Sequence, residues 1–224
     1  MKNVLEKYKY ILISIFLLFL LSFFGCLMLV IRWLRIGTPK YLFLIWNLFL
    51  SWIPLGISLI MRYIHSKVNR SGFILVFLGM IWLLFYPNAP YMLTDYIHLR
   101  NSHSLLTWVD LVIHSVFIWT SLFVGFLSLF IVNGIIHKLT NKIIVWLFTI
   151  GVLYLSSFGI YLGRFIRWNS WDMILNPLSL ITSVLENINF ESILFTMMYG
   201  ILLTLIYTFL YGLTFLRLDK VDSK

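Results

Sequence analysis

Six long apolar segments dominate this sequence and limit the folds that it can adopt. They cover residues 10–31, 41–61, 72–86, 108–136, 143–163 and 192–216. Most reach the roughly 20 residues that an α-helix needs to cross a bilayer. The chain is 61% hydrophobic and only 11% charged, and a water-soluble globule of this size could not bury so much apolar surface. The sequence therefore predicts an all-α, polytopic membrane bundle that forms a single integral membrane domain over residues 1–224.

The basic residues indicate an orientation and argue against nucleic acid as a partner. The formal net charge is +9, but Lys and Arg lie at the ends of apolar segments, as membrane-flanking charges do. With the N-terminus inside, 11 of the 17 basic residues fall inside, and the remaining six outside are Arg32, Arg35, Lys40, Arg100, Arg164 and Arg167. Because an excess of Lys and Arg favours the cytoplasmic side, we expect both termini in the cytoplasm.

Two prolines interrupt the third apolar segment. From Ser71 to Tyr86 the chain could form roughly 24 Å of helix at ~1.5 Å per residue, less than the hydrocarbon layer of about 30 Å. Pro87 and Pro90 then remove backbone donors. Irregular backbone at membrane depth survives only where protein or a water-filled cavity covers it. The segment therefore predicts a broken third helix beside a polar site, with Asn88 as the cap of a short second helix.

Two pairs of ionisable side chains follow this break. Asp95 and His98 are three residues apart, and Asp110 and His114 are four apart, so each pair would share a helix face. We expect Asp95 and His98 to be the catalytic pair, since an Asp that orients a His can make it a proton acceptor. Hydrogen bonding within the bundle is the plainer alternative. His114 is expected to be structural, and Asp110 to be an interfacial acid that stabilises a helix N-terminus.

The same four side chains raise the question of a metal. Aspartate and histidine are ligands that divalent ions accept, but their spacing here matches no specific metal signature. We therefore expect no metal and no other cofactor. No nucleophile elbow, phosphate loop or dinucleotide-binding motif occurs in the sequence either.

A second polar stretch, GIYLGRFIRWNSWD, follows the fifth apolar segment at residues 159–172. Its two arginines suit a lipid phosphate, an anionic sugar or a carboxylate, because guanidinium groups bind such anions through paired hydrogen bonds. The expected ligand-binding residues are Asn88, Tyr91, Arg164, Arg167, Asn169, Ser170 and Asp172. Two alternatives stay open: the arginines could be end charges that reach the membrane interface, or they could pair with an aspartate across the two loops as a structural latch.

Two further patterns concern packing and the membrane surface. Residues 177–188 begin with Asn-Pro, a favourable helix start, and divide into an apolar and a polar half. They are too short to cross, so we expect an amphipathic helix that lies flat on the outer interface. In the fourth apolar segment one face carries small and polar residues, which are typical of close helix packing. These residues are Asp110, His114, Ser121, Gly125 and Ser128.

The two polar stretches resemble a known family. WLLFYPNAPYMLTDYIHL at residues 82–99, Trp108 with Asp110, and the arginine-containing stretch are similar to the bacterial multi-pass membrane proteins grouped as domain of unknown function number thirteen sixty-one. The resemblance covers roughly residues 42–211 and implies a bacterial cytoplasmic (inner) membrane protein whose activity is not established. The positions that follow the family pattern are Pro87, Asn88, Pro90, Tyr91, Asp95, Gly163, Arg164, Arg167, Asn169, Ser170 and Asp172.

These observations support three functions, which the sequence leaves open. The leading hypothesis is an outward-facing polar site, formed by the broken third helix and the end of the fifth, that binds or modifies an anionic envelope or lipid-linked ligand. The alternatives are a small transporter or permease component and a non-catalytic membrane scaffold subunit. The expected partners are membrane lipids and an anionic lipid or glycan precursor. Whether the protein is an enzyme, and its oligomeric state, do not follow from the sequence.

Overall fold

The computed structural model describes residues 2–67, 72–101, 107–168 and 175–215, and every regular element in these ranges is helical. Six helical segments there are long and apolar enough to cross a membrane, so the predicted all-α fold with six spans is confirmed. They comprise residues 9–36, 43–67, 72–99, 108–136, 142–166 and 190–214. The chain forms two compact units, residues 1–132 and 133–224, and the expectation of a single domain stays a prediction.

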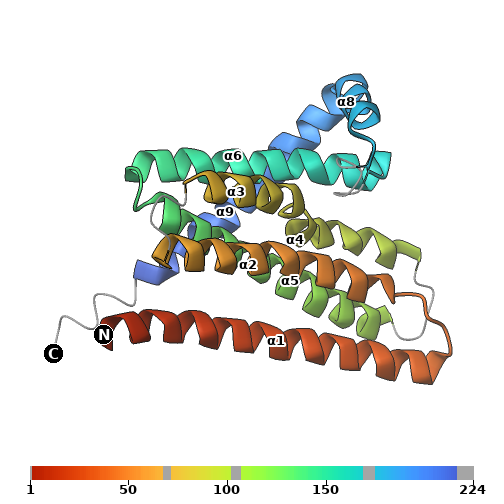
Figure 1. Cartoon of the computed structure of the whole chain (residues 1–224). Coiled ribbons are helices and arrows are strands. Elements are labelled where there is room, and N and C mark those ends of the chain that lie inside the picture. The colour runs from red at the N-terminus through yellow and green to blue at the C-terminus, as the bar shows by residue number, and fades with distance from the viewer. Residues whose placement is uncertain (1, 68–71, 102–106, 169–174, 216–224) are drawn as a thin grey trace. The chain divides into compact units, whose positions relative to one another are not determined.

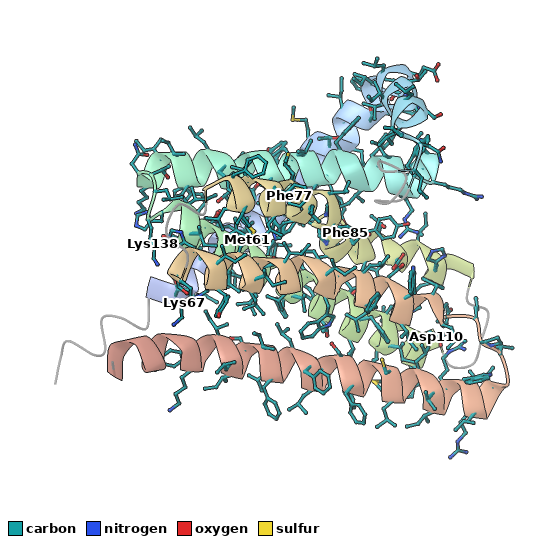
Figure 2. The ribbon with its side chains drawn as sticks, viewed as in Figure 1. Met61, Lys67, Phe77, Phe85, Asp110 and Lys138 are labelled. Carbon is teal, nitrogen blue, oxygen red and sulfur yellow. The ribbon has the colours of Figure 1, made fainter. Side chains whose placement is uncertain are left out.

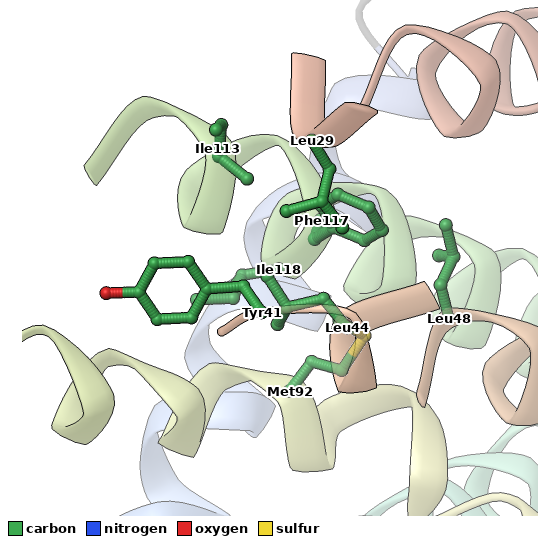
Figure 3. Packing of buried hydrophobic residues seen from close by; sticks show 8 residues of the cluster. All are labelled: Leu29, Tyr41, Leu44, Leu48, Met92, Ile113, Phe117 and Ile118. Carbon is green, nitrogen blue, oxygen red and sulfur yellow. The ribbon is translucent and has the colours of Figure 1, made fainter. Parts of the chain in front are cut away.

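The described residues of the first unit form five elements and most of a sixth (Figure 1). They are α1 (Lys2–Ile36), α2 (Phe43–Lys67), α3 (Gly72–Phe85), α4 (Asn88–Tyr91), the 3-10 helix η1 (Met92–Asn101) and α5 (Thr107–Ile136). Their apolar faces meet in a cluster of buried side chains from α1, the turn before α2, α2, η1 and α5 (Figure 3), which removes apolar surface from the surroundings. This cluster is Leu29, Tyr41, Leu44, Leu48, Met92, Ile113, Phe117 and Ile118.

The third span breaks where the prolines predict, but Asn88 does not cap the new helix. Helix α3 ends at Phe85 and α4 begins at Asn88, with Pro87 at the N-cap position and no side-chain cap. The amide Nδ2 of Asn88 instead donates to the carbonyl oxygen of Phe85 at 2.8 Å. The capping prediction was wrong because Pro87, at φ −57° and ψ −25°, already has helical backbone. Asn88 therefore falls inside the helix and bonds a carbonyl left open at the end of α3.

The broken helix packs on the small-residue face of α5, which confirms the packing interpretation of that face. The Ser121 hydroxyl donates to the carbonyl oxygen of Ala89 at 2.7 Å, and the indole of Trp82 donates to Ser128 Oγ at 2.7 Å. Gly125 faces Ala89 so closely that an added Cβ would lie 2.6 Å from the Ala89 Cβ. These contacts fix the break against α5.

The third span is also longer than predicted. It was expected to end at residue 86, but α4 and η1 continue the helical path, so the segment that is long enough to cross extends to Leu99. A 3-10 helix of ten residues is unusual, since runs of more than three or four residues are uncommon. Helix η1 carries Asp95 and His98, and the contacts of α4 with α5 therefore determine where these two side chains lie.

In the described part of the second unit, the last turn of α5 is followed by four further elements. They are α6 (Lys142–Tyr161), the π-helical turn η2 (Leu162–Ile166), α8 (Pro177–Glu186) and α9 (Phe190–Phe215). Helices α6 and α9 pack together, with Gly200 against the ring of Tyr154. Asn133 donates to Thr149 Oγ1 at 2.8 Å and to Tyr207 Oη at 2.7 Å. This polar group joins α5, α6 and α9 within the unit.

The predicted amphipathic helix forms as α8 and ends at Glu186, two residues before the expected end at residue 188. Asn176 precedes it at the N-cap position but makes no side-chain cap bond. Leu178, Ile181 and Leu185 on its apolar face are exposed, which suits a helix whose apolar side contacts lipid. Its location on the outer interface stays a prediction.

Candidate functional site

Asp95 and His98, the predicted catalytic pair, are neighbours on η1, and of the two side chains His98 is the accessible one. Nε2 of His98 is 3.8 Å from Oδ1 of Asp95, and the side chain of His98 is 42% exposed whereas that of Asp95 is 1% exposed. Asn47 of α2 donates from Nδ2 to Oδ2 of Asp95 at 3.4 Å. The ring of Phe43 meets the His98 ring edge-on, with centroids 5.0 Å apart. A buried carboxylate thus lies beside an accessible imidazole, an arrangement suited to acid–base chemistry.

A second buried polar group in the same unit joins residues that the sequence analysis did not connect. Arg32, near the end of α1, forms a paired contact with Asp110 of α5, through Nε to Oδ1 at 2.5 Å and Nη2 to Oδ2 at 3.2 Å. Tyr41 donates its hydroxyl to Oδ2 of Asp110 at 3.2 Å, and the guanidinium carbon lies 4.5 Å from the centre of the Tyr41 ring. We call Arg32, Tyr41 and Asp110 the ion-pair cluster.

The ion-pair cluster corrects two interpretations of the sequence. Asp110 was expected to be an interfacial acid, and Arg32 was counted as a membrane-flanking charge. Both side chains are instead almost completely buried, at 0% and 4% exposure. Asp110 lies at the end of the unit opposite to Lys67 (Figure 2), so the cluster is buried near one end of the bundle. Burial of an isolated charge is costly. Each charge of this pair compensates the other, which makes the burial of both possible.

His114 lies one turn after Asp110 and packs against the ion-pair cluster. Its Nδ1 bonds to the backbone oxygen of Asp110 at 2.8 Å, and its ring meets that of Tyr41 edge-on at 4.5 Å and 87°. It is fully buried. These contacts agree with the expected structural role of His114. Within the described parts of the chain, no three His, Cys, Asp or Glu side chains gather closely enough to hold a metal ion, and the expectation about cofactors stays a prediction.

The two predicted arginines lie at the end of the fifth span, in the second unit. Helix α6 continues into the π-helical turn η2, which carries Arg164, and Arg167 follows in a left-handed conformation with φ 68° and ψ 32°. Its backbone N–H donates to the carbonyl oxygen of Leu162. Left-handed backbone is uncommon for residues other than glycine and strained positions of this kind cluster at functional sites. We call residues 162–168 the arginine turn.

Aromatic side chains hold the arginine turn in place. Phe165 packs on Tyr161 of α6 and on Phe195 of α9, with ring centroids 5.0 and 5.5 Å apart. The indole of Trp168 donates to Ser183 Oγ of α8 at 2.9 Å. The arginine turn is therefore attached to α9 on one side and to the amphipathic helix on the other.

The structure places some of the predicted site residues in the same unit. Asn88 and Tyr91 belong to α4, in the same unit as the Asp95–His98 pair. The arginine turn belongs to the second unit, which is described by itself. The remaining predicted ligand residues, among them the aspartate of the hypothetical latch, lie outside the described residues. They are Asn169, Ser170 and Asp172.

Sequence reasoning missed Arg32 and Tyr41 as partners of Asp110, and Asn47 as a partner of Asp95. A signal was present, since Asp110 and His114 are polar residues one turn apart on a helix that is otherwise strongly apolar, and charges at such positions need partners. The partner itself could not be identified, because 78 residues separate Arg32 from Asp110.

Comparison with known proteins adds a family but no activity. A family model described as "Protein of unknown function (DUF1361)" matches residues 46–206, within the range over which the two polar stretches resemble that family. The match includes the Asp95–His98 pair and the arginine turn, whereas Arg32 and Tyr41 precede it. No curated protein and no solved structure matches the chain.

Proposed function

The chain belongs to the DUF1361 family of membrane proteins of unknown function, and we propose that it binds the anionic headgroup of a lipid or lipid-linked envelope precursor at the outward side of the membrane. The observation that carries this proposal is the arginine turn. It presents two guanidinium groups at the end of a span, beside an amphipathic helix whose apolar residues are exposed.

The chemistry of the arginine turn suits a phosphate or carboxylate on a lipid. Arg167 is exposed and Arg164 is half-buried, so both are within reach of an anion at the interface. A guanidinium group offers a planar set of donors that matches the oxygens of such an anion. Leu178 and Leu185 of α8 are exposed and could contact acyl chains while the arginines bind the headgroup. The hydrogen bond from the Trp168 indole to Ser183 Oγ links the arginine turn to α8.

The outward location rests on the distribution of basic residues, since 11 lie on the side of the termini and six on the other side. For the first unit taken by itself, we propose Asp95 and His98 as an acid–base pair.

The proposal predicts that the arginine turn determines affinity for an anionic headgroup. In neutral detergent, the full chain should bind a short-chain anionic phospholipid at least ~10-fold more tightly than the Arg164→Gln/Arg167→Gln variant does. The loss of one hydrogen bond between charged groups typically costs about 1.5–3 kcal/mol, and 1.4 kcal/mol corresponds to a factor of ten. Calorimetric titration measures the dissociation constant of the phospholipid for the full chain and for the variant.

Three comparisons make this test specific. Lys138→Gln/Lys142→Gln removes two exposed charges at the other end of α6 and should leave the affinity nearly unchanged. A zwitterionic phospholipid of the same chain length should bind weakly to every variant. Inorganic phosphate should bind more weakly than the anionic phospholipid if α8 contributes acyl contacts. Equal losses in the arginine and lysine variants would contradict the proposal, since they would indicate attraction by net charge alone.

A further inference from the structure

The arginine turn ends on one carbonyl oxygen that accepts two backbone bonds. The N–H groups of Arg167 and Trp168 both donate to the carbonyl oxygen of Leu162, the second at 3.3 Å. The left-handed backbone of Arg167, at φ 68°, accompanies this closure, as it does at the ends of many helices. Glycine adopts this conformation without steric cost, whereas arginine does not. An arginine at this position is therefore best explained by a role of its side chain.

Trp168 joins this closed turn to α8 through its side chain. The indole Nε1 donates to Ser183 Oγ at 2.9 Å, and both side chains are half-buried. Ser183 is also bonded to the end of α8, because Asn187 Nδ2 donates to its carbonyl oxygen at 2.8 Å and lies 3.5 Å from its hydroxyl oxygen. An indole has a single donor, so this bond uses the full hydrogen-bonding capacity of the Trp168 side chain. The residue after Arg167 is thereby connected to the second half of α8.

Helix α8 leaves large apolar residues exposed. Leu178, Ile181 and Leu185 are 79%, 56% and 67% exposed, and no residue of Pro177–Glu186 is buried. Contact with acyl chains would remove the apolar surface of these side chains from water. The placement of α8 should therefore depend on the lipid surface, and the bond from Trp168 passes that dependence to the arginine turn.

We propose that Trp168 and Ser183 are positioning residues, which couple the contact of α8 with lipid to the guanidinium groups of Arg164 and Arg167. With α8 on the lipid surface, the bond holds the arginine turn in place before the anion arrives. Such pre-organisation raises affinity, because less conformational entropy is lost on binding. The inference rests on the proposed function, since it concerns the same anion site, and it adds two residues that need not contact the anion.

A double-mutant cycle on the full chain in nanodiscs of a zwitterionic phospholipid tests the proposal. The probe is glycerol phosphate, a soluble form of an anionic headgroup, and nitrogen-15 NMR of labelled arginine side chains follows its binding. Trp168→Phe keeps an aromatic ring and removes the donor, and Ser183→Ala removes the acceptor. Each should weaken binding about 2- to 10-fold, as expected for one hydrogen bond between neutral groups. Because both changes break the same bond, the double variant should lose no more than either single variant.

Three further variants separate positioning from a general structural effect. Ser183→Thr keeps the hydroxyl and should bind the probe as wild type does. Thr182→Ala removes the neighbouring hydroxyl of α8, which donates to the carbonyl oxygen of Leu178 at 3.1 Å, and should leave the affinity unchanged. Leu178→Ser/Leu185→Ser reduces contact with lipid and should weaken binding. The same pair of changes should add little in Trp168→Phe, where α8 is already uncoupled from the arginine turn.

The outcomes distinguish this inference from the function on which it rests. If wild type binds glycerol phosphate and folded Trp168→Phe and Ser183→Ala bind it equally well, the inference is overturned and the anion site stands. Losses that add up in the double variant would also overturn the inference, because the two residues would then act separately. A wild type that does not bind the probe would contradict the proposed function, and the inference with it.

Discussion

Substitution of Asp110 by asparagine lowers the free energy of unfolding by about 3–5 kcal/mol, because it leaves the buried guanidinium of Arg32 without its counter-charge. The loss is large since the uncompensated charge remains in a site with almost no access to water. Reversible unfolding in detergent micelles measures it. Arg32→Gln should also lower the free energy of unfolding, because it leaves the buried carboxylate of Asp110 without its counter-charge.

Two further variants distinguish the ion pair from a general effect of charge. Arg35→Gln removes an exposed arginine from the same helix, and such surface changes usually stay within about 0.5 kcal/mol. Arg32→Met/Asp110→Leu replaces both charges by apolar side chains and should recover most of the loss, as buried pairs often do. A cost for Asp110→Asn no larger than that of Arg35→Gln would show that the pair does not form.

Substitution of Gly125 by alanine lowers the unfolding free energy by about 1–3 kcal/mol, the usual cost of overpacking. The new Cβ would lie 2.6 Å from the Cβ of Ala89. Both atoms are attached directly to helical backbone, so only a shift of α4 away from α5 relieves the contact. Because η1 continues from α4, the same shift should disturb the Asp95–His98 pair.

The matched control for this substitution lies on the same helix. An added Cβ at Gly134 meets no atom within 4 Å, so Gly134→Ala should be neutral or slightly stabilising, as alanine is the better helix former. Unfolding in detergent micelles compares the two variants with wild type. Equal stabilities of Gly125→Ala and Gly134→Ala would contradict the close packing of the broken helix on α5.

Much of the fold could be predicted because it follows from local rules. Apolar length predicts the six spans, the prolines predict the break after Tyr86, and the small-residue face of α5 predicts where another helix packs closely. The amphipathic pattern after Asn176 likewise predicts α8. Each of these inferences uses only residues within one or two helical turns of one another.

The candidate site depends more on contacts that local rules do not reach. Arg32 pairs with a residue 78 positions away, and its place at the end of an apolar segment suggests an ordinary flanking charge. Asparagine is strongly preferred at helix N-caps, but the backbone of Pro87 is already helical. The side-chain amide of Asn88 therefore donates to the carbonyl oxygen of Phe85 instead. The left-handed conformation of Arg167 has no sequence signal, since glycine is the residue expected at such positions.

Native mass spectrometry of gently extracted protein tests most directly the claim that the arginine turn binds an anionic lipid-linked ligand. Wild type should carry a lipid or glycan precursor with a phosphate or carboxylate group, and folded Arg164→Gln/Arg167→Gln should lose it. Asp95→Asn should retain it, because Asp95 is proposed to act on a proton and not to bind the anion. A ligand-free wild type, or the same anionic species in equal amount on the arginine variant, would contradict the claim.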